Sequence, residues 1–280
     1  MTLNTIDWND EWKSVMIQRS GSAVSTCAQH WDSAESARNY LRDYGRENSS
    51  HTDRVSATLE ALHLSPDSRV LEIGSGPGVL TVPIASRTAH VTAVEPSDGM
   101  MTVLQEYMKK EGTENIRCVQ KRWEDVADDD LEPQYDLVLA SFSLGMPEIK
   151  TAIEKMNAAS SERVCLFWHA GEPQFETLYR LALPHILGTD YVPVPKADVL
   201  FNLLYAMGIY PDVRYFDFEQ MHVFDSEEEM ARHFLYEYHI PFDTGNRGLR
   251  AYLEEYVEEQ DGRFVHHERW PCMMFQWNVQ

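Results

Sequence analysis

Three glycines and two acidic residues lie at spacings that suit the binding of a nucleotide-like ligand. Gly74, Gly76 and Gly78 directly follow the strand-like run VLEI, and such a cluster is tolerated where backbone bends sharply or approaches something closely. Glu72 stands two residues before the first glycine, and Glu95 ends the next strand-like run, VTAVE. A carboxylate in the position of Glu95 can accept hydrogen bonds from both hydroxyls of a ribose. A carboxylate in the position of Glu72 suits a ligand with a cationic amino group, because the opposite charges attract.

The glycine spacing departs from the dinucleotide-binding pattern G-x-G-x-x-G. Val79 occupies the place of the required third glycine, and an anionic Glu72 would be a poor neighbour for a pyrophosphate. We therefore do not expect a nicotinamide-dependent oxidoreductase. A tight turn between strand and helix, with no ligand, is the alternative interpretation of the glycines, and for Glu95 the alternative is an ordinary acid at a helix start.

Strand-like and helix-like segments alternate on both sides of this loop. Strands are expected at 69–74, 90–96, 116–120, 135–142 and 163–170, and helices at 78–87, 99–112 and 147–160. The strands are apolar runs without strict alternation, which is typical of strands buried on both faces. The sequence predicts an α/β fold with a doubly wound, mostly parallel, seven-stranded sheet.

The flanking regions do not show this regular alternation of strands and helices. Residues 1–62 are expected to form a helical N-terminal cover, with Asp32 capping a helix that ends at Gly45. Residues 63–171 are the predicted ligand-binding core. Residues 172–280 are expected to supply helical insertions and the last two strands of the same sheet, at 213–224 and 264–279. In this part Asp225 is expected to cap one helix and Gly262 to end another.

The pattern E-x-G-x-G-x-G after a strand resembles motif I of the class I, Rossmann-like S-adenosylmethionine (SAM)-dependent methyltransferases of the small-molecule type. The likeness spans roughly residues 69–171 and implies that SAM is the methyl donor and S-adenosylhomocysteine the product. In the segment Arg122–Val126, expected to meet the adenine, the chain departs from the Asp that many relatives carry. The cofactor-binding residues that the resemblance implies are Glu72, Gly74, Ser75, Gly76, Gly78, Glu95, Pro96, Trp123, Glu124, Ser141 and Tyr44.

Methyl transfer from a sulfonium is an in-line displacement that needs positioning more than a dedicated nucleophile. His169, at the end of the fifth strand, is the candidate general base, with a histidine bonded to a backbone carbonyl as the alternative. Tyr40, one turn before Tyr44 on the N-terminal helix, is a candidate to line the site through cation–π contact. Both tyrosines could instead be packing residues of an amphipathic helix.

No metal site is expected from the sequence. Cys27 and His30 have C-x-x-H spacing and His51 follows, but nothing completes a zinc set. Alternation along a strand sends the neighbours His266 and His267 to opposite faces, so they are not expected to form a metal pair.

The chain is acidic, with a formal net charge of −21, so we expect no nucleic-acid partner. It has no run of eighteen apolar residues and no signal-peptide pattern, which predicts no membrane association. Four scattered cysteines indicate a reducing, cytoplasmic setting.

The acceptor is expected to be a small molecule, because the predicted insertions are rich in aromatic residues that would form a lid. They include Phe175, Tyr179, Leu183, Tyr191, Phe201, Leu204, Tyr205, Phe234 and Tyr238. Two other functions stay open, a methyltransferase acting on a protein and a non-catalytic SAM- or S-adenosylhomocysteine-binding protein. A homodimer is an open alternative to a monomer.

Overall fold

The computed structural model describes residues 6–20, 33–45, 54–188, 190–243 and 245–279. Its strands are β1 (Arg69–Ile73), β2 (His90–Val94), β3 (Ile116–Val119), β4 (Tyr135–Ser141), β5 (Ser160–His169), β6 (Asp212–Phe224), β7 (Val257–Gln260) and β8 (Arg263–Asn278). Its α-helices are α1 (Trp8–Ser20), α3 (Ala34–Tyr44), α4 (Arg54–Ala61), α5 (Thr81–Ala85), α6 (Asp98–Glu111), α7 (Ile149–Ala159), α8 (Gln174–Leu187), α9 (Ala197–Ala206), α10 (Glu227–Tyr238) and α11 (Arg247–Tyr256). Two 3₁₀ turns cover Trp123–Asp125 and Asp128–Asp130.

All eight strands belong to one sheet, in the order β3-β2-β1-β4-β5-β8-β6, with β7 paired to β8. The strands β1 to β5 are parallel, whereas β8 runs antiparallel to both β5 and β6. The strand order reverses between β1 and β4, and in open α/β sheets ligands bind at the carboxyl ends of the strands beside such a point. The predicted doubly wound, mostly parallel fold is confirmed, with the short β7 as an additional strand.

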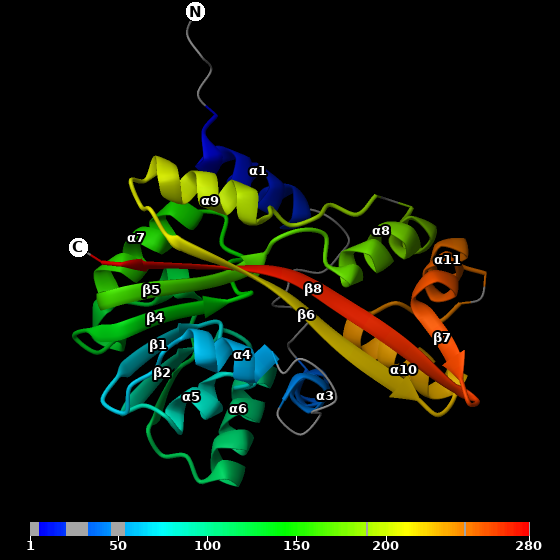
Figure 1. Ribbon diagram of the computed structural model, residues 1–280, viewed down its shortest axis with the longest axis horizontal. Helices are drawn as coiled ribbons and strands as arrows, with labels where there is room; N and C mark the ends of the chain where they lie inside the picture. The colour runs from blue at the N-terminus through cyan, green and yellow to red at the C-terminus, as the bar shows by residue number, and fades with distance from the viewer. Residues whose placement is uncertain (1–5, 21–32, 46–53, 189, 244, 280) are drawn as a thin grey trace, which may run out of the picture.

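Helices cover both faces of the parallel strands (Figure 1), with α1, α7 and α9 on one side and α4, α5 and α6 on the other. Alternate residues of β1 point into the two cores: Leu71 and Ile73 join the first, and Val70 joins the second. This double burial explains why the strands appear in the sequence as unbroken apolar runs.

The strands β6 and β8 form a long ribbon that extends past the parallel strands (Figure 1). Its outer part is packed by α8, α10, α11 and β7 around a separate apolar cluster that includes Phe224, Phe234 and Tyr252. Helix α3 contacts α6 on one side and α10 on the other, so it lies between the core and the ribbon.

Helix α1 lies within the region expected to form a helical cover, but the sequence did not define its bounds. Its own amphipathicity is weak, but Trp12 is fully buried and its indole Nε1 donates to the Met146 carbonyl at 2.9 Å. One large anchor therefore holds this helix, and a single anchor gives no periodic signal in the sequence.

Several element ends also differ from the expectations. The helix after the glycine loop is confined to α5, which contains Pro83. Ser33 caps α3, and the expected cap Asp32 lies outside the described residues. Ser226 rather than Asp225 caps α10. The last helix ends at Tyr256, and Gly262 instead has φ of +77° in the turn between β7 and β8.

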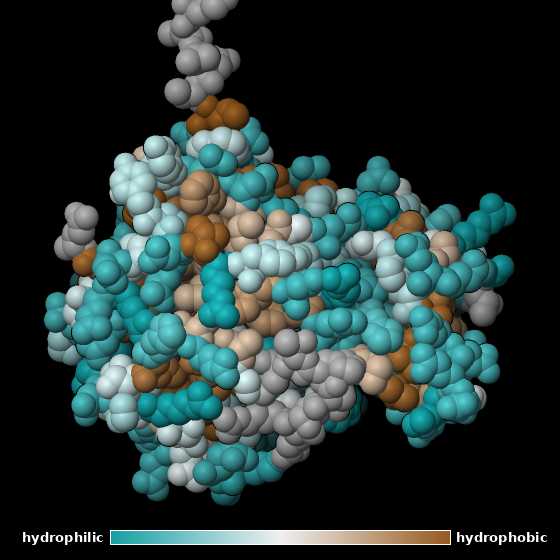
Figure 2. Space-filling model, viewed as in Figure 1, coloured by the Kyte–Doolittle hydropathy of each residue, from teal (hydrophilic) through white to brown (hydrophobic). Residues whose placement is uncertain are grey.

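Figure 2 shows hydrophilic residues over most of the visible face, as the net charge leads one to expect. Among the described residues, no helix is both long and apolar enough to cross a membrane.

Candidate active site

The glycine loop connects β1 to α5 at the point where the strand order reverses. Gly74, Gly76 and Gly78 all have positive φ, of +70°, +55° and +91°. A Cβ on Gly74 would lie 2.3 Å from the Ser143 Cβ, and one on Gly78 would lie 2.5 Å from a methyl carbon of Leu104. A Cβ on Gly76 would meet nothing within 4 Å. Two glycines are therefore required by packing within the protein, while Gly76 faces open space.

Glu95, at the end of β2, is fixed beside this open space by backbone amides. Its Oε2 accepts from the Gly76 N–H and its Oε1 from the Ser97 N–H, both at 2.9 Å. Each oxygen keeps a second lone pair for a ligand hydroxyl. Burial raises the pKa of Glu95, and the two amide hydrogen bonds act against that rise. A carboxylate held by two backbone amides therefore lies next to the glycine turn, and its binding of a ribose stays a prediction.

Glu72 is buried in β1, with 2% of its surface exposed. Its Oε2 accepts a 2.7 Å hydrogen bond from the Thr81 hydroxyl. Burial raises its pKa to about 8, with the neighbouring charge of Glu95 adding to the rise and the Thr81 hydrogen bond opposing it. Such a carboxyl is poised to ionise when a cationic group is placed beside it.

Serines and one strained residue surround the same edge of the sheet. The Ser75 hydroxyl is buried and has no hydrogen-bond partner among the described residues. Ser141 is half-buried at the end of β4, and Ser143 donates to the Ile73 carbonyl, so it ties the β4 loop to the glycine loop. Between them Phe142 has φ of +55°. A positive φ at a bulky residue is uncommon and concentrates at functional sites, but no sequence pattern announces it.

His169 lies at the end of β5 and is 8% exposed. Its ring centroid is 4.9 Å from that of Phe142 and 5.6 Å from that of Phe175. Burial lowers its pKa to about 3, with the positive charges of Lys196 and Arg19 contributing. Its Nδ1 is buried and has no hydrogen-bond partner among the described residues. The imidazole is thus neutral at physiological pH, and this low pKa disfavours it as a strong general base.

Tyr40 and Tyr44 lie together at the end of α3, with ring centroids 4.5 Å apart. The Tyr44 hydroxyl donates to Glu268 at 3.3 Å. The guanidinium of Arg54 lies 5.8 Å from the Tyr44 ring centroid and 5.7 Å from that of Phe142. Arg54 therefore connects the α3 tyrosines to the end of β4, a role that the sequence did not suggest.

The segment expected to meet the adenine is divided between core and surface. Trp123 is 2% exposed, and its indole donates to the Ala152 carbonyl at 3.2 Å beneath α7. The Lys155 ammonium lies 4.5 Å from its ring centroid. Glu124 and Pro96 are exposed. The placement of Trp123 favours the packing role for this residue and leaves the other two available to a ligand.

The predicted lid residues separate into three groups. Phe175, Tyr179 and Tyr191 extend from His169 as a series of ring contacts, with centroids 5.9 and 5.3 Å apart along the series. Leu183, Leu204, Phe234 and Tyr238 are buried in apolar clusters, whereas Phe201 and Tyr205 are exposed. The first group is the part of the insertion that lies next to the candidate site.

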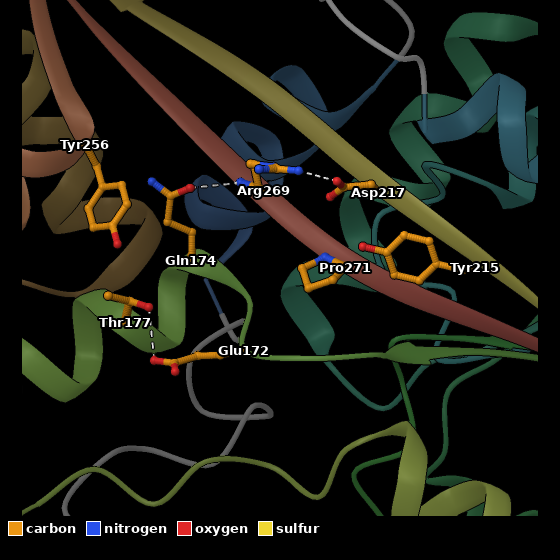
Figure 3. Close-up of a pocket in the computed structure, with 8 residues that line it drawn as sticks. All are labelled: Glu172, Gln174, Thr177, Tyr215, Asp217, Tyr256, Arg269 and Pro271. Carbon is orange, nitrogen blue, oxygen red and sulfur yellow. Dashed lines mark hydrogen bonds and ion pairs between the residues drawn. The ribbon is translucent and has the colours of Figure 1, made fainter.

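A separate open pocket lies between α8 and the ribbon (Figure 3). The residues that line it are Glu172, Gln174, Thr177, Tyr215, Asp217, Tyr256, Arg269 and Pro271. Arg269 forms an ion pair with Asp217 across β6 and β8. None of the predicted site residues lines this pocket, so it is distinct from the glycine-loop site.

Comparison with known proteins agrees with this geometry. Residues 70–161 match the model of a family described as "Methyltransferase domain". An uncharacterized protein of Haemophilus influenzae is 27% identical over 227 residues, which are 79% of this chain and 80% of that protein. A ribosomal RNA small subunit methyltransferase A of Desulforapulum autotrophicum is 39% identical over 56 residues, only 20% of either chain.

The fold is also found among solved structures. A candidate methyltransferase from Bacillus halodurans C-125 superposes with a TM-score of 0.54 at 14% sequence identity, covering 81% of this chain and 99% of that one. At that identity the likeness concerns the fold alone. The family match covers the glycine loop, Glu95 and β4, which are the parts that form the candidate site. Residues 70–161 therefore form a methyltransferase domain of the class I, Rossmann-like, SAM-dependent type.

Proposed function

We propose that this protein transfers a methyl group from SAM to a small-molecule acceptor at the carboxyl ends of β1, β2, β4 and β5. One observation carries the proposal. The space next to Gly76 is open, and the Glu95 carboxylate lies beside it, fixed by a hydrogen bond from the Gly76 N–H. Residues 63–171 would bind the cofactor, residues 1–62 would cover it, and residues 172–280 would complete the acceptor site. The protein would act in the cytoplasm, a reducing compartment that the scattered cysteines favour.

The residues of the loop fit the parts of the cofactor. Glu95 would accept from the two ribose hydroxyls through its free lone pairs, and Gly76 gives the ligand close access to the backbone. Glu72, whose pKa is raised to about 8, would pair with the amino group of the methionine moiety and ionise as it does so. The buried Ser75 hydroxyl would gain the hydrogen-bond partner that it lacks among the described residues.

SAM supplies a methyl carbon already activated by its sulfonium, so the protein contributes orientation and exclusion of water. His169 would accept a hydrogen bond at Nδ1 from the acceptor and hold its nucleophilic atom in line, rather than remove a proton as a strong base. The rings of Phe142 and Phe175 on either side of His169 exclude water there. Tyr40 and Tyr44 would offer ring faces toward the cationic sulfur.

A small acceptor is favoured over a macromolecule by the aromatic series Phe175, Tyr179 and Tyr191. These rings come from the insertion that follows β5, and the buried Glu176 holds the loop beyond α8 by accepting from the Tyr191 hydroxyl at 3.2 Å and the Val194 N–H at 3.0 Å. A covered apolar approach of this kind suits a small, partly aromatic or apolar molecule. The net charge of −21 disfavours RNA.

The test is transfer of a radiolabelled methyl group from SAM to fractions of a cell extract separated by size. The proposal expects label in the small-molecule fraction, with transfer abolished in Glu95→Gln and retained in Glu111→Gln, which changes an exposed residue at the end of α6. Label confined to the protein fraction would replace the acceptor with a protein. Binding of SAM without transfer to either fraction would favour a non-catalytic SAM-binding protein.

A further inference from the structure

Three buried histidines meet on the ribbon, away from the glycine loop. His222 on β6 and His266 on β8 are direct cross-strand partners, and His233 comes from α10, which covers that face. One ring nitrogen of each lies within 4.8 Å of those of the other two. The side chains are nearly inaccessible, since His222 and His266 are 6% and 0% exposed and the His233 side chain is 8% exposed.

Each ring has a nitrogen without a hydrogen-bond partner among the described residues. These atoms are Nε2 of His222, Nε2 of His233 and Nδ1 of His266. The opposite nitrogen of His266 is held by the Tyr252 hydroxyl at 2.8 Å, and that of His233 lies 3.8 Å from the Asp43 carboxylate. A metal-ligating histidine is commonly oriented in this way, with one nitrogen fixed by an outer partner and the other directed at the ion.

We propose that His222, His233 and His266 bind a zinc ion through these three nitrogens. Imidazole suits zinc at distances of about 2.0–2.1 Å, which places the ligating nitrogens of a tetrahedral site about 3.4 Å apart. Binding therefore draws the three rings slightly inward. A carboxylate oxygen of Glu268, which is 1% exposed, lies 3.5 Å from His222 Nε2 and completes the surroundings on that side.

The charges around the cluster agree with a cation. Three buried acidic side chains, Asp43, Glu237 and Glu268, belong to this region. Burial raises the pKa of Glu237, and repulsion from Glu268 and Asp43 adds to the rise. A divalent ion offsets their negative charge.

An ion at this position would stabilise the packing of the surrounding elements. It would join β6, β8 and α10, and through Glu268 it would reach the Tyr44 hydroxyl on α3. The Tyr44 ring also lies edge-on to His222, with centroids 6.5 Å apart. A bound ion would thus hold α3, which carries the tyrosines of the candidate active site, against the ribbon.

This cluster is independent of the spacing noted at Cys27, His30 and His51, which lie outside the described residues. In the sequence, His266 stands out only as a neighbour of His267. Strand alternation does separate those two, since the His267 side chain is 41% exposed and lies 3.3 Å from Glu219. His267 is therefore a matched control on the same strand.

The experiment measures zinc in the full-length chain without a histidine tag. The protein is treated with chelator, re-equilibrated with buffered Zn²⁺ and assayed by elemental analysis, and Co²⁺ is used in parallel for its visible absorption. The proposal expects about one zinc per chain, a tetrahedral Co²⁺ spectrum and a rise in Tm when Zn²⁺ is added to the chelated protein. His222→Gln and His233→Gln should each lose at least tenfold in zinc affinity, while His267→Gln should keep it.

Circular dichroism and cooperative urea unfolding establish that each variant is folded. If one of the two cluster variants does not fold, the other decides the question, since His222 lies on a strand and His233 on a helix. Folded wild-type protein that takes up no zinc would overturn the proposal, and so would unchanged zinc affinity in a folded cluster variant. Neither result depends on methyl transfer, so this test is separate from that of the proposed function.

Discussion

At the scale of single residues, the site depends on where strain, burial and hydrogen bonds are concentrated. The three loop glycines all have positive φ angles, but glycine is not required for the same reason at all three positions. A side chain at Gly74 or Gly78 would meet protein atoms, whereas one at Gly76 would enter open space. The two acids also differ, because Glu95 is held by two amides and Glu72 by one hydroxyl. These differences lead to two predictions.

Replacing Gly76 with alanine should weaken SAM binding by at least tenfold while lowering stability by only about 1–2 kcal/mol, the cost of a Cβ in the left-handed region. The added Cβ projects into the space assigned to the ligand. Gly112→Ala is the matched control, because Gly112 has φ of +65°, equally open surroundings and a position at the far end of α6. Calorimetric titration and urea unfolding measure the two effects, and equal SAM affinities in both variants would contradict the assignment.

Glu72 makes the stability of the ligand-free protein depend on pH. Its pKa is about 8 in the folded protein against an ordinary value of 4.5, so between these values the folded state binds more protons than the unfolded state. Stability from this group is therefore present below about pH 4.5 and is lost as pH rises toward 8. Glu72→Gln should gain Tm relative to wild type as pH is raised from 5 to 8, although it binds SAM more weakly.

The control for that measurement is Glu111→Gln, which changes an exposed carboxylate at the end of α6. The same ionisation predicts that SAM binding near pH 7 releases a proton, which titrations in buffers of different ionisation enthalpy detect. A Tm difference between wild type and Glu72→Gln that stays constant across this pH range would show that Glu72 is ionised before the ligand arrives.

At the scale of elements, the strands and helices that could be predicted are those with a clear hydrophobic pattern in the local sequence. The parallel strands β1, β2 and β4 were expected because burial on both faces demands unbroken apolar runs, and Glu95 followed from its place after one of them. The bounds of helix α1 could not be predicted within the expected helical cover, since one buried tryptophan rather than a periodic stripe attaches it. The assignment of Trp123 to the adenine illustrates a different limit, because only packing against α7 shows which way that side chain points.

The anchoring of α1 can be tested directly. Trp12→Ala should lower the free energy of unfolding by about 3–5 kcal/mol, as truncation of a fully buried tryptophan usually does. Trp12→Phe should cost less, because it keeps most of the apolar contact and loses the hydrogen bond to Met146. Ile17→Ala, on the exposed side of the same helix, should change stability by about 0.5 kcal/mol or less. Equal urea midpoints for Trp12→Ala and Ile17→Ala would show that α1 is not held by this residue.

At the scale of the whole molecule, the fold brings together residues that are far apart in the chain. The histidine cluster depends on the register of β6 with β8 and on the packing of α10, neither of which any local motif encodes. Phe142, Arg54 and His169 likewise meet only once the sheet order is known. Sequence patterns could therefore identify the glycine loop, Glu95 and His169 as candidates, whereas the contacts among Phe142, Arg54 and His169 required the structure.

The net charge of −21 should make stability depend on salt. Repulsion among like charges disfavours the compact state, and salt screens it. Tm should rise when NaCl is increased from about 10 mM to about 500 mM, a range over which the Debye length falls from about 30 Å to less than 8 Å. A fall in Tm over this range would mean that attractive ion pairs outweigh the excess negative charge.

The central claim is that the glycine loop and Glu95 bind SAM. The measurement that tests it most directly is calorimetric titration of wild type, Glu95→Ala and the exposed control Glu111→Ala with SAM, S-adenosylhomocysteine and NAD. We predict micromolar binding of the two sulfur ligands to wild type and Glu111→Ala, its loss in Glu95→Ala, and no binding of NAD. Folded wild-type protein that binds neither sulfur ligand, or a Glu95→Ala variant that binds them as tightly as wild type, would contradict the account.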